Sequence, residues 1–254
     1  MKKTMASPAL LVAAGLLFAP AVPAVPAGAA GAAGAAGAVM ARTCTATNGN
    51  TCDFGHWIIY DNTWGPTPGS YVIHASSQSH WSVSASQNGG GGCGGCAVEA
   101  YESAQWDYSG VRVSSIKYLY STFSETMPTG SRRKNGVDAE AAYDMFINGS
   151  DTDEVMVWVD NQGQTPAGSR DGTVRIRGQK FGLYLAGRTK SFVLGKNETS
   201  GTISYFAILG WLHRHGMLAS KDTLSQFNFG WEICDTGGQP RTFTVRKLTL
   251  HQKV

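Results

Sequence analysis

Short runs of β-type residues, repeated along most of the chain, constrain its fold more than any other feature of the sequence. From residue 57 onwards, runs rich in Val, Ile, Tyr, Phe, Trp and Thr are separated by Gly, Asn, Asp and Pro, a pattern typical of strands. We expect strands at Trp57–Asp61, Tyr71–Ser76, Ala97–Tyr101, Ser114–Thr122, Ala139–Ile147, Glu154–Asp160, Gly172–Arg177, Lys180–Ala186, Lys190–Leu194, Ser225–Trp231 and Arg241–His251. Many short strands without intervening helices predict an all-β fold, a β-jelly-roll sandwich of two antiparallel sheets.

One segment departs from this pattern and predicts a single helix. Its apolar residues recur at the i, i+3, i+4 and i+7 spacing of a helical stripe. They are Tyr205, Ile208, Leu209 and Leu212. Thr202 or Ser204 is a suitable N-cap, and Gly216 is a suitable stop. We therefore expect one helix of about three turns, packed by its stripe on the outer face of a sheet.

The first 41 residues have the composition of an export signal. Lys2 and Lys3 precede an apolar run from Ala9 to Ala19 that is too short to span a bilayer, and a Pro/Ala/Gly tract follows over residues 20–38. The alternative is an uncleaved anchor. We expect residues 1–41 to be a signal peptide with its Ala/Gly-rich tract, and residues 42–254 to form one secreted, extracellular domain.

The charge balance argues against nucleic acid or an anionic membrane as a partner. The chain has 21 Lys and Arg and 18 Asp and Glu, of which the first 41 residues hold only two Lys, so residues 42–254 carry a net charge of +1. A nearly neutral domain lacks the basic surface that such partners need. We expect no nucleic-acid partner, no membrane partner, and a monomer.

Five cysteines remain after the signal, and pairing is expected in an oxidising compartment. The pairs that lie close in sequence are Cys44–Cys52 and Cys93–Cys96, which leaves Cys234 over. A redox CxxC is the alternative for Cys93-Gly-Gly-Cys96, but its glycine run does not favour the helix that such a motif opens. No His or second CxxC lies at ligand spacing for zinc. We therefore expect two disulfides, no metal site and a reduced Cys234.

The segment Glu154-Val-Met-Val-Trp-Val-Asp160 places an unusual set of side chains on one face of a strand. Alternation puts the three valines on a core face and four other residues opposite them: Glu154, Met156, Trp158 and Asp160. An indole beside a carboxylate suits a sugar, because the ring can stack on the apolar C–H face while the carboxylate meets the anomeric carbon. The alternative is an ordinary solvated face.

A second strand has the same character. In Gln226-Phe-Asn-Phe-Gly-Trp-Glu232-Ile, the aromatic residues and Ile share one face, and Asn228, Gly230 and Glu232 share the other. Gly230 is expected to leave room beside Glu232. A glycosidase needs two carboxyl groups that face one groove, because one attacks or activates water and the other protonates the leaving oxygen. We expect both glutamates to project from neighbouring strands into one groove.

A third acid, Asp144, lies ten residues before Glu154. A hairpin with its turn near Asn148-Gly-Ser-Asp would bring the two strands together, so that Asp144 lies near Glu154 and tunes its ionisation. The alternative for Asp144 is a surface acid near a turn.

Several segments in the same order resemble glycoside hydrolase family 12, a jelly-roll family of endo-acting β-1,4-glucanases and xyloglucanases. Asp-Glu154-Val-Met-Val-Trp158 resembles the nucleophile strand of the family, and Phe229-Gly-Trp-Glu232 its acid/base strand. The other matching segments are Ala142-Tyr-Asp144-Met-Phe, Asp61-Asn62-Thr-Trp64-Gly65, and Thr165-Pro166-Ala-Gly168. The resemblance covers nearly all of residues 42–254.

The resemblance implies a role for each matching residue. Glu154 would be the nucleophile, Glu232 the general acid/base, and Asp144 the acid that contacts the nucleophile. The substrate, a β-glucan polysaccharide, would be bound by Asn62, Trp64, Met156, Trp158 and Pro166. The implied mechanism is a retaining double displacement that needs no cofactor.

The alternatives that remain are a non-catalytic carbohydrate-binding jelly roll and a xyloglucan- or xylan-active enzyme of the same architecture. The sequence also departs from the family pattern. Asp61 stands where the family has Asn, Cys52 lies close to Cys44 in place of the usual first disulfide, and Cys234 is unusual beside Glu232. Cellulose, mixed-linkage glucan and xyloglucan all remain open as substrates.

Overall fold

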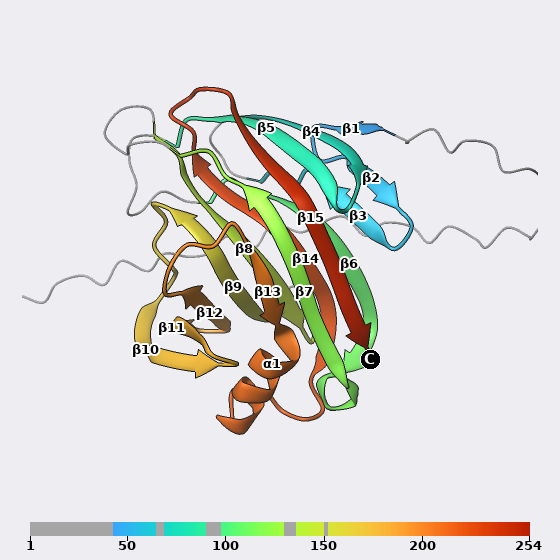
Figure 1. The fold of residues 1–254 in the computed structure, drawn as a ribbon, viewed down its shortest axis with the longest axis vertical. Coiled ribbons are helices and arrows are strands. Elements are labelled where there is room, and N and C mark those ends of the chain that lie inside the picture. The colour runs from blue at the N-terminus through green and yellow to red at the C-terminus, as the bar shows by residue number, and fades with distance from the viewer. Residues whose placement is uncertain (1–42, 65–68, 90–97, 130–135, 150–151) are drawn as a thin grey trace, which may run out of the picture. The chain divides into compact units, whose positions relative to one another are not determined.

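Strands of alternating apolar and polar residues build two stacked sheets in the computed structural model, which describes residues 43–64, 69–89, 98–129, 136–149 and 152–254 (Figure 1). The six-stranded sheet has the order β1 (Cys44–Ala46), β4 (Gly69–Ser77), β5 (His80–Gln87), β15 (Arg241–Lys253), β7 (Tyr118–Thr126) and β13 (Ser200–Ser204). The nine-stranded sheet has the order β10 (Ser169–Ile176), β11 (Gln179–Ala186), β12 (Thr189–Leu194), β9 (Asp153–Gln162), β8 (Asp138–Ile147), β14 (Thr223–Asp235), β6 (Ala100–Arg112), β3 (Trp57–Tyr60) and β2 (Thr51–Phe54). The predicted all-β sandwich is confirmed.

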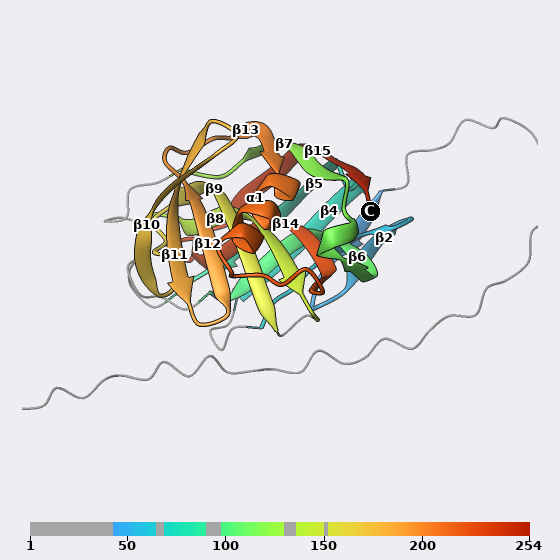
Figure 2. The same cartoon turned by 90° about the horizontal axis from the view of Figure 1, so that it is seen from below.

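Pairing between these strands is antiparallel with one exception. Strands β9 and β12 run parallel, with Glu154 opposite Thr189. The crossover between them is the β10–β11 hairpin, which extends the nine-stranded sheet to its edge (Figure 2). Strand β12 therefore pairs with β9 on the side opposite β8, and this pairing brings residues near 190 beside Glu154.

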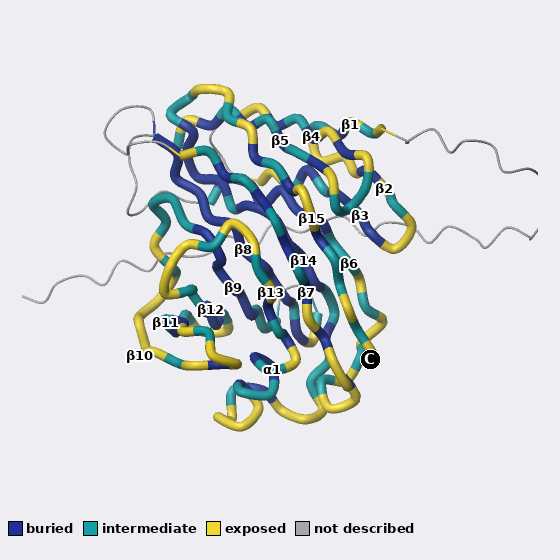
Figure 3. Tube along the Cα trace, in the orientation of Figure 1, coloured by how far each residue is buried: buried dark blue, intermediate teal, exposed yellow. Residues whose placement is uncertain are grey.

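The core lies between the two sheets and is rich in aromatic side chains. Along β14, Phe227, Phe229 and Trp231 are fully buried, and most of β8 and β9 is dark blue in Figure 3. The Trp231 ring lies 5.1 Å from Trp81 of β5, and the Phe229 ring lies 5.6 Å from Phe123 of β7. Burial of a side chain such as Phe contributes roughly 1.5–3 kcal/mol. This packing fixes which face of β14 points inward, and therefore forces Asn228, Gly230 and Glu232 to the opposite face.

The helix α1 (Tyr205–Arg214) extends this core. Its buried residues are Tyr205, Ile208, Leu209 and Leu212, the stripe expected from the sequence. The Tyr205 ring lies 5.1 Å from both Tyr143 of β8 and Phe227 of β14. Ser204 occupies the N-cap position, and Gly216 follows the C-cap with a φ of 72°. The helix thus packs on the core side of the nine-stranded sheet, which faces away from the acids described below, whereas the sequence suggested an outer face.

Several boundaries differ from the sequence-based expectation. The strand expected at Ser114 begins only at Tyr118, because Val113–Ser115 form a 3₁₀ turn. Four strands were not predicted, namely β1, β2, β5 and β13. The serine residues of β5 point outward and its Trp81, Val83 and Ala85 point inward, so alternation was present but masked by polar composition.

Some expectations concern residues outside the described ranges. These are the signal segment 1–41, the predicted start of a strand at Ala97, and the Cys93–Cys96 pair. Among the described residues, no helix has the length and apolar character needed to cross a membrane.

Candidate active site

The nine-stranded sheet carries a set of carboxylic acids on the face that points away from the core. We call this the acid face, and define it by Asp144 of β8, Glu154 of β9 and Glu232 of β14. On β9, the three valines at 155, 157 and 159 belong to the core, as alternation predicts. Met156 and Trp158 instead form a separate small apolar cluster with Ala142 of β8 and Val193 of β12.

The expectation that Asp160 shares the acid face is wrong. The register of β8 and β9 shifts after Trp158, which lies opposite Ala142, so that Asp160 lies opposite the core residue Ala141. A bulge of this kind adds one residue to one strand and thereby reverses the facing of the residues beyond it. The charge of Asp160 accordingly acts on Glu125, a buried acid of β7 that accepts a hydrogen bond from the core Trp231 indole.

Glu232 lies on the acid face as predicted, but the reason for its glycine neighbour is different. A Cβ on Gly230 would lie 1.9 Å from the carbonyl oxygen of Glu102 on β6. Gly230 is therefore required by the close approach of the β6 backbone, and the prediction that it leaves room for a ligand beside Glu232 is not needed to explain it.

Strand β8 lies between the strands that carry the two glutamates. Glu154 is opposite Phe146 of β8, and Glu232 is opposite Glu140 of the same strand. The expectation that the glutamates lie on neighbouring strands is therefore wrong. The predicted hairpin is confirmed, because β8 and β9 are joined at a turn in which Asn148 and Gly149 have φ values of 63° and 117°.

Asp144 is held between the two glutamates. It is 2% exposed, and its carboxyl is hydrogen-bonded to Glu154. Burial, followed by the charges of Glu154 and Glu232, raises the pKa of Asp144 well above its usual range. A neutral Asp144 can donate its O–H in a hydrogen bond to Glu154, so the expected contact with Glu154 is present.

Glu154 has a second donor that the sequence did not suggest. The Thr189 hydroxyl of β12 donates a hydrogen bond of 2.7 Å to Oε2 of Glu154. A hydrogen bond of this length fixes the orientation of the Glu154 carboxyl group. The parallel pairing of β9 and β12 thus supplies a hydroxyl to Glu154 from 35 residues further along the chain.

Several neighbouring groups shift the pKa of Glu232. Burial raises the pKa of Glu232 above its usual value, a hydrogen bond with Glu140 lowers it, and the charge of Glu154 raises it. Tyr101 of β6 lies directly opposite Glu232, and its hydroxyl donates a 3.2 Å hydrogen bond to the Ala142 carbonyl. Burial and the charges of four acids raise the pKa of Tyr101 well above its usual range, so it remains a neutral donor.

Sequence reasoning missed both Glu140 and Tyr101. Glu140 lies four residues before Asp144 on the same strand, so alternation alone would have placed it on the acid face. No comparable signal marked Tyr101, because its position depends on the register of β6 against β14. The buried polar atoms of the acid face that have no hydrogen-bonding partner among the described residues include Asp144 Oδ1, Asn228 Oδ1 and Trp158 Nε1.

The remaining predicted sugar-binding residues lie at two edges of this region. The Asn62 carbonyl accepts a 2.9 Å hydrogen bond from the Tyr101 amide, so Asn62 stands two strands away from Glu232. Trp64 follows it, and its indole is 40% exposed. Pro166 is half-buried in the β9–β10 loop, where Gly168 has a φ of 80° and its missing Cβ would lie 2.0 Å from the Leu185 carbonyl oxygen.

Asp61, which departs from the family pattern, is buried and hydrogen-bonded within the fold. It is 1% exposed and accepts hydrogen bonds from the Gly49 amide and the Thr63 hydroxyl. It also lies against Glu102, whose pKa is raised well above its usual range by burial and by the charge of Asp61. Asp61 therefore belongs to a buried acid pair on the core side and does not alter the acid face directly.

The predicted Cys44–Cys52 disulfide is present, with its Cα atoms 5.8 Å apart. It joins β1 of one sheet to β2 of the other. Cys234 is buried and is not bonded to either of these cysteines. The Cys93–Cys96 disulfide stays a prediction.

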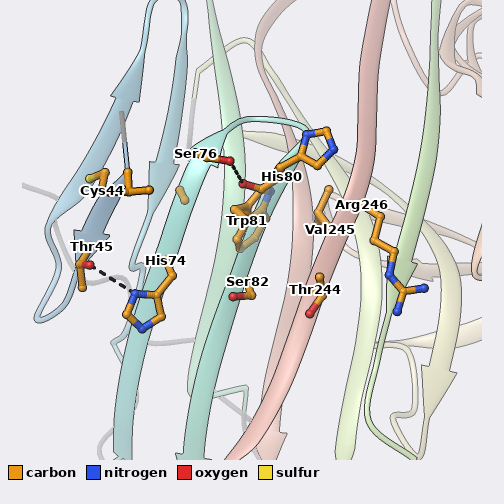
Figure 4. Close-up of a pocket in the computed structure, with 12 residues that line it drawn as sticks. Cys44, Thr45, His74, Ser76, His80, Trp81, Ser82, Thr244, Val245 and Arg246 are labelled. Atoms are coloured by element: carbon orange, nitrogen blue, oxygen red, sulfur yellow. Dashed lines mark hydrogen bonds between the residues drawn. The ribbon is translucent and has the colours of Figure 1, made fainter. Parts of the chain in front are cut away.

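A hollow of about 520 Å³ lies on the other sheet, across β1, β4, β5 and β15 (Figure 4). Its lining includes His74, His80 and Arg246 but no carboxylic acid. Because glycoside hydrolysis needs carboxyl groups, this hollow is not a candidate for that chemistry. In the described part of the chain, no group of three or more His, Cys, Asp or Glu side chains is arranged to hold a metal ion.

Comparison with known proteins identifies a family over most of the chain. The model of glycosyl hydrolase family 12 matches residues 55–251. The chain is 25% identical over 216 residues, 79% of its length and 87% of the relative's, to a xyloglucan-specific endo-β-1,4-glucanase A from Emericella nidulans.

Solved structures show the same fold. The xyloglucanase domain of a type three effector from Sinorhizobium fredii, in complex with cellobiose, superposes with a TM-score of 0.72 at 20% identity, covering 83% of this chain and 99% of that domain. Endoglucanase 3 of Trichoderma harzianum superposes with a TM-score of 0.71 at 23% identity, covering 85% and 100%. With the family model matched over 55–251, the chain belongs to glycosyl hydrolase family 12 and is a glycosidase.

Proposed function

We propose that the chain is a secreted, endo-acting glycosidase that cleaves β-1,4-glucosidic bonds in cellulose or related β-glucans by a retaining double displacement. One observation carries this proposal. Glu154 and Glu232 lie on the same face of the nine-stranded sheet, and the strand between them carries Asp144 hydrogen-bonded to Glu154. This is the pair of carboxyl groups that both classes of glycosidase require.

The mechanism follows from the surroundings of each acid. The Glu154 carboxylate, held by the Thr189 hydroxyl and by Asp144, attacks the anomeric carbon as the bond to the leaving oxygen breaks. Glu232, whose pKa is raised by burial, gives its proton to that oxygen. In the second step Glu232 takes a proton from water, the water oxygen attacks the anomeric carbon, and Glu154 is released as a carboxylate.

Aromatic and polar groups around the acids are suited to hold the sugar chain. Trp64 and Trp158 present flat rings, and the unpartnered Asp144 Oδ1, Asn228 Oδ1 and Trp158 Nε1 can exchange hydrogen bonds with hydroxyls. Asn62, Met156 and Pro166 complete the proposed sugar contacts. A polar, partly buried face of this kind orients a neutral polymer through hydrogen bonds and stacking.

Hydrolysis of a panel of soluble polysaccharides tests the substrate. The Emericella relative is named as xyloglucan-specific, so xyloglucan should be tested beside carboxymethyl cellulose and mixed-linkage glucan. An endo-acting enzyme should lower the viscosity of its substrate before much reducing sugar accumulates. Release of single glucose units from chain ends would exclude endo action, and inactivity on the whole panel would exclude the proposed function.

The stereochemistry of the product tests the mechanism. Retaining enzymes hold their carboxyl groups about 5–5.5 Å apart, against roughly 6.5–9.5 Å in inverting enzymes. We expect the first product to carry the β-configuration at its new reducing end, as seen by proton NMR in the first minutes of hydrolysis. An early burst of the α-anomer would show inversion, and the roles given to Glu154 and Glu232 would be wrong.

Variants of the two glutamates separate their roles. Glu154→Ala should abolish turnover, and azide should partly restore it by occupying the vacated space and giving an α-glycosyl azide. Glu232→Ala should impair substrates with poor leaving groups most, because good leaving groups depart without a proton. Azide rescue of Glu232→Ala with an α-product, and none of Glu154→Ala, would reverse the assignment.

Export is tested separately. Removal of residues 1–41 on secretion should leave a mature protein beginning near Arg42, which intact mass and N-terminal sequencing of the culture supernatant can determine. Retention of the full-length chain on the cell would instead support an uncleaved anchor.

A further inference from the structure

Glu140 is a buried acid for which the proposed mechanism has so far given no role. It lies near the start of β8 (Asp138–Ile147), is 0% exposed, and stands directly opposite Glu232 across the β8–β14 ladder. No hydrogen bond from another described residue reaches either of its two oxygens except through the carboxyl of Glu232. Two carboxyl groups can share a hydrogen bond only when one of them carries a proton.

The proton of this pair belongs with Glu140. Glu140 has no exposed surface, whereas Glu232 is half-buried, so ionisation of Glu140 is the less favourable of the two. Burial, and then the charge of Glu232, raise the pKa of Glu140 well above its usual range. Glu140 is therefore the donor and Glu232 the acceptor whenever Glu232 is ionised.

The charged and titratable neighbours of Glu140 do not offer another partner. Asp138 and Asp144 flank it on β8, and Tyr101 of β6 approaches from beyond β14. On the β9 side, Asn161 is its partner in the register, and Glu154 lies further along that strand. No Lys or Arg is among these residues. Among the described residues that act on Glu140, its own proton is therefore the donor available to the Glu232 carboxylate.

We propose that Glu140 is a positioning residue that keeps its own proton throughout the reaction and donates it as a hydrogen bond to the Glu232 carboxylate. The proposal rests on the acid/base role proposed for Glu232. When the glycosidic bond breaks, the Glu232 proton moves to the leaving oxygen, and the new carboxylate accepts a hydrogen bond from Glu140. When water attacks the glycosyl-enzyme, Glu232 takes the proton of that water and returns to its acid form. Glu140 ends as it began, so no proton is gained or lost by the pair.

The direct test is a titration of Glu232 in three proteins. Carbon-13 labelling of glutamate carboxyl groups allows the Glu232 signal to be assigned from its absence in Glu232→Gln. Glu140→Gln retains an N–H donor of the same shape but cannot ionise, whereas Glu140→Leu removes the donor and keeps the bulk. A hydrogen bond to a charged group typically shifts an equilibrium about tenfold to a hundredfold.

We expect the pKa of Glu232 to rise by about one to two pH units in Glu140→Leu and to stay within about half a unit of wild type in Glu140→Gln. Should Glu140→Leu fail to fold, Glu140→Ala is the donor-free variant. An unchanged pKa in the donor-free variant, or the same rise in Glu140→Gln, would overturn the proposal. This readout needs no turnover, so it decides the role of Glu140 even if the wild type hydrolyses none of the β-glucans.

The pH profile of kcat/KM is the second readout. Its basic limb reports loss of the acid form of Glu232, so it should move upward in Glu140→Leu and remain in place in Glu140→Gln. Glu125→Gln is the matched control, because it removes another buried acid that lies on the core side of the sandwich. A basic limb that moves equally in Glu125→Gln and Glu140→Leu would indicate a general effect of lost buried acids and would refute the specific role of Glu140.

Discussion

Trp64 and Trp158 differ at the scale of the residue, although both are flat rings proposed to contact sugar. The Trp158 ring is 4% exposed and lies in the small apolar cluster with Met156 and Ala142, so it also supports the sheet. Trp64 is 40% exposed. A residue that contributes little to packing yet presents a large ring to solvent is a sharper probe of binding than one that does both.

Trp64→Ala should therefore weaken substrate use while leaving the fold almost unchanged. Loss of one stacking contact is expected to lower kcat/KM by roughly tenfold, which corresponds to about 1.4 kcal/mol, and to leave the free energy of unfolding nearly at its wild-type value. Trp231→Ala is the contrasting variant, since Trp231 is 0% exposed and its removal should cost about 3–5 kcal/mol of stability.

Urea denaturation of both variants, with kinetics per folded molecule, checks this difference. A large loss of stability in Trp64→Ala with unchanged kcat/KM would mean that Trp64 is a packing residue.

At the scale of the element, the backbones of β14 and β6 approach each other so closely at residue 230 that only glycine fits there. The Cβ of an alanine at 230 would lie 1.9 Å from the Glu102 carbonyl oxygen and 2.7 Å from Ser103 Cα, both backbone atoms of β6. Neither strand can move without disturbing the aromatic core behind it. Strand β14 also carries Glu232, so this close contact holds the proposed acid/base in its place.

Gly230→Ala should lower the free energy of unfolding by about 3–5 kcal/mol, which is a large effect for a single substitution. Gly210 in α1 is the matched control, because its added Cβ would meet only the end of the flexible Arg214 side chain, at 3.4 Å. Gly210→Ala should stabilise the protein by about 0.5–1 kcal/mol through the higher helix propensity of alanine. Thermal unfolding of the two variants should thus shift in opposite directions, and a shift of Gly230→Ala to higher temperature would contradict the close approach.

Strand pattern predicted more of the fold than of the candidate site. Alternation in Glu154-Val-Met-Val-Trp placed three residues on the correct face because the inward valines fix the strand. It failed at Asp160, since a bulge depends on how β8 and β9 pair and leaves no mark in the local sequence. Strand β13 (Ser-Gly-Thr-Ile-Ser) was missed because its composition is that of a turn and only pairing with β7 makes it a strand.

The candidate site shows the same limit. Glu154, Glu232 and Asp144 were found from their own strands, and their placement on one face agrees with that prediction. The order of the strands could not be found in this way, so β8 was not expected between the glutamates. Thr189 and Tyr101 approach the acids only because of pairings between distant segments.

At the scale of the whole molecule, the described chain buries more carboxylic acids than an ordinary core does. The buried ones with a raised pKa include Glu102, Glu125, Glu140 and Asp144, and burial is the first cause in each. A carboxyl group whose pKa is raised in the folded state keeps its proton at a pH where the same group in the unfolded chain has lost it. Raising the pH through that window favours the unfolded state, so stability should be greater in mildly acidic solution.

Glu125 offers a clean measurement of this effect. Its pKa rises from 4.5 to about 8 because of burial, so its contribution is fully present below 4.5 and is lost as the pH rises to about 8. The slope can reach about 1.4 kcal/mol per pH unit. Between about pH 5 and pH 8, Glu125→Gln should lose less stability than wild type, as followed by calorimetry at constant ionic strength. Parallel stability curves for the two proteins would show that Glu125 is not buried as a neutral acid.

The central position of β14 also has a consequence for how activity appears in time. Glu232 pairs with Tyr101, which lies 131 residues earlier, and with Glu140, which lies 92 residues earlier. Ladders between such distant segments form slowly, because a long stretch of chain must be ordered before they can close. The two glutamates therefore meet only after β14 has entered the sheet, and β14 is the second-to-last strand of the described chain. On the roles proposed for the two glutamates, a chain whose synthesis has not yet reached β14 carries Glu154 without Glu232, and we expect it to have no activity.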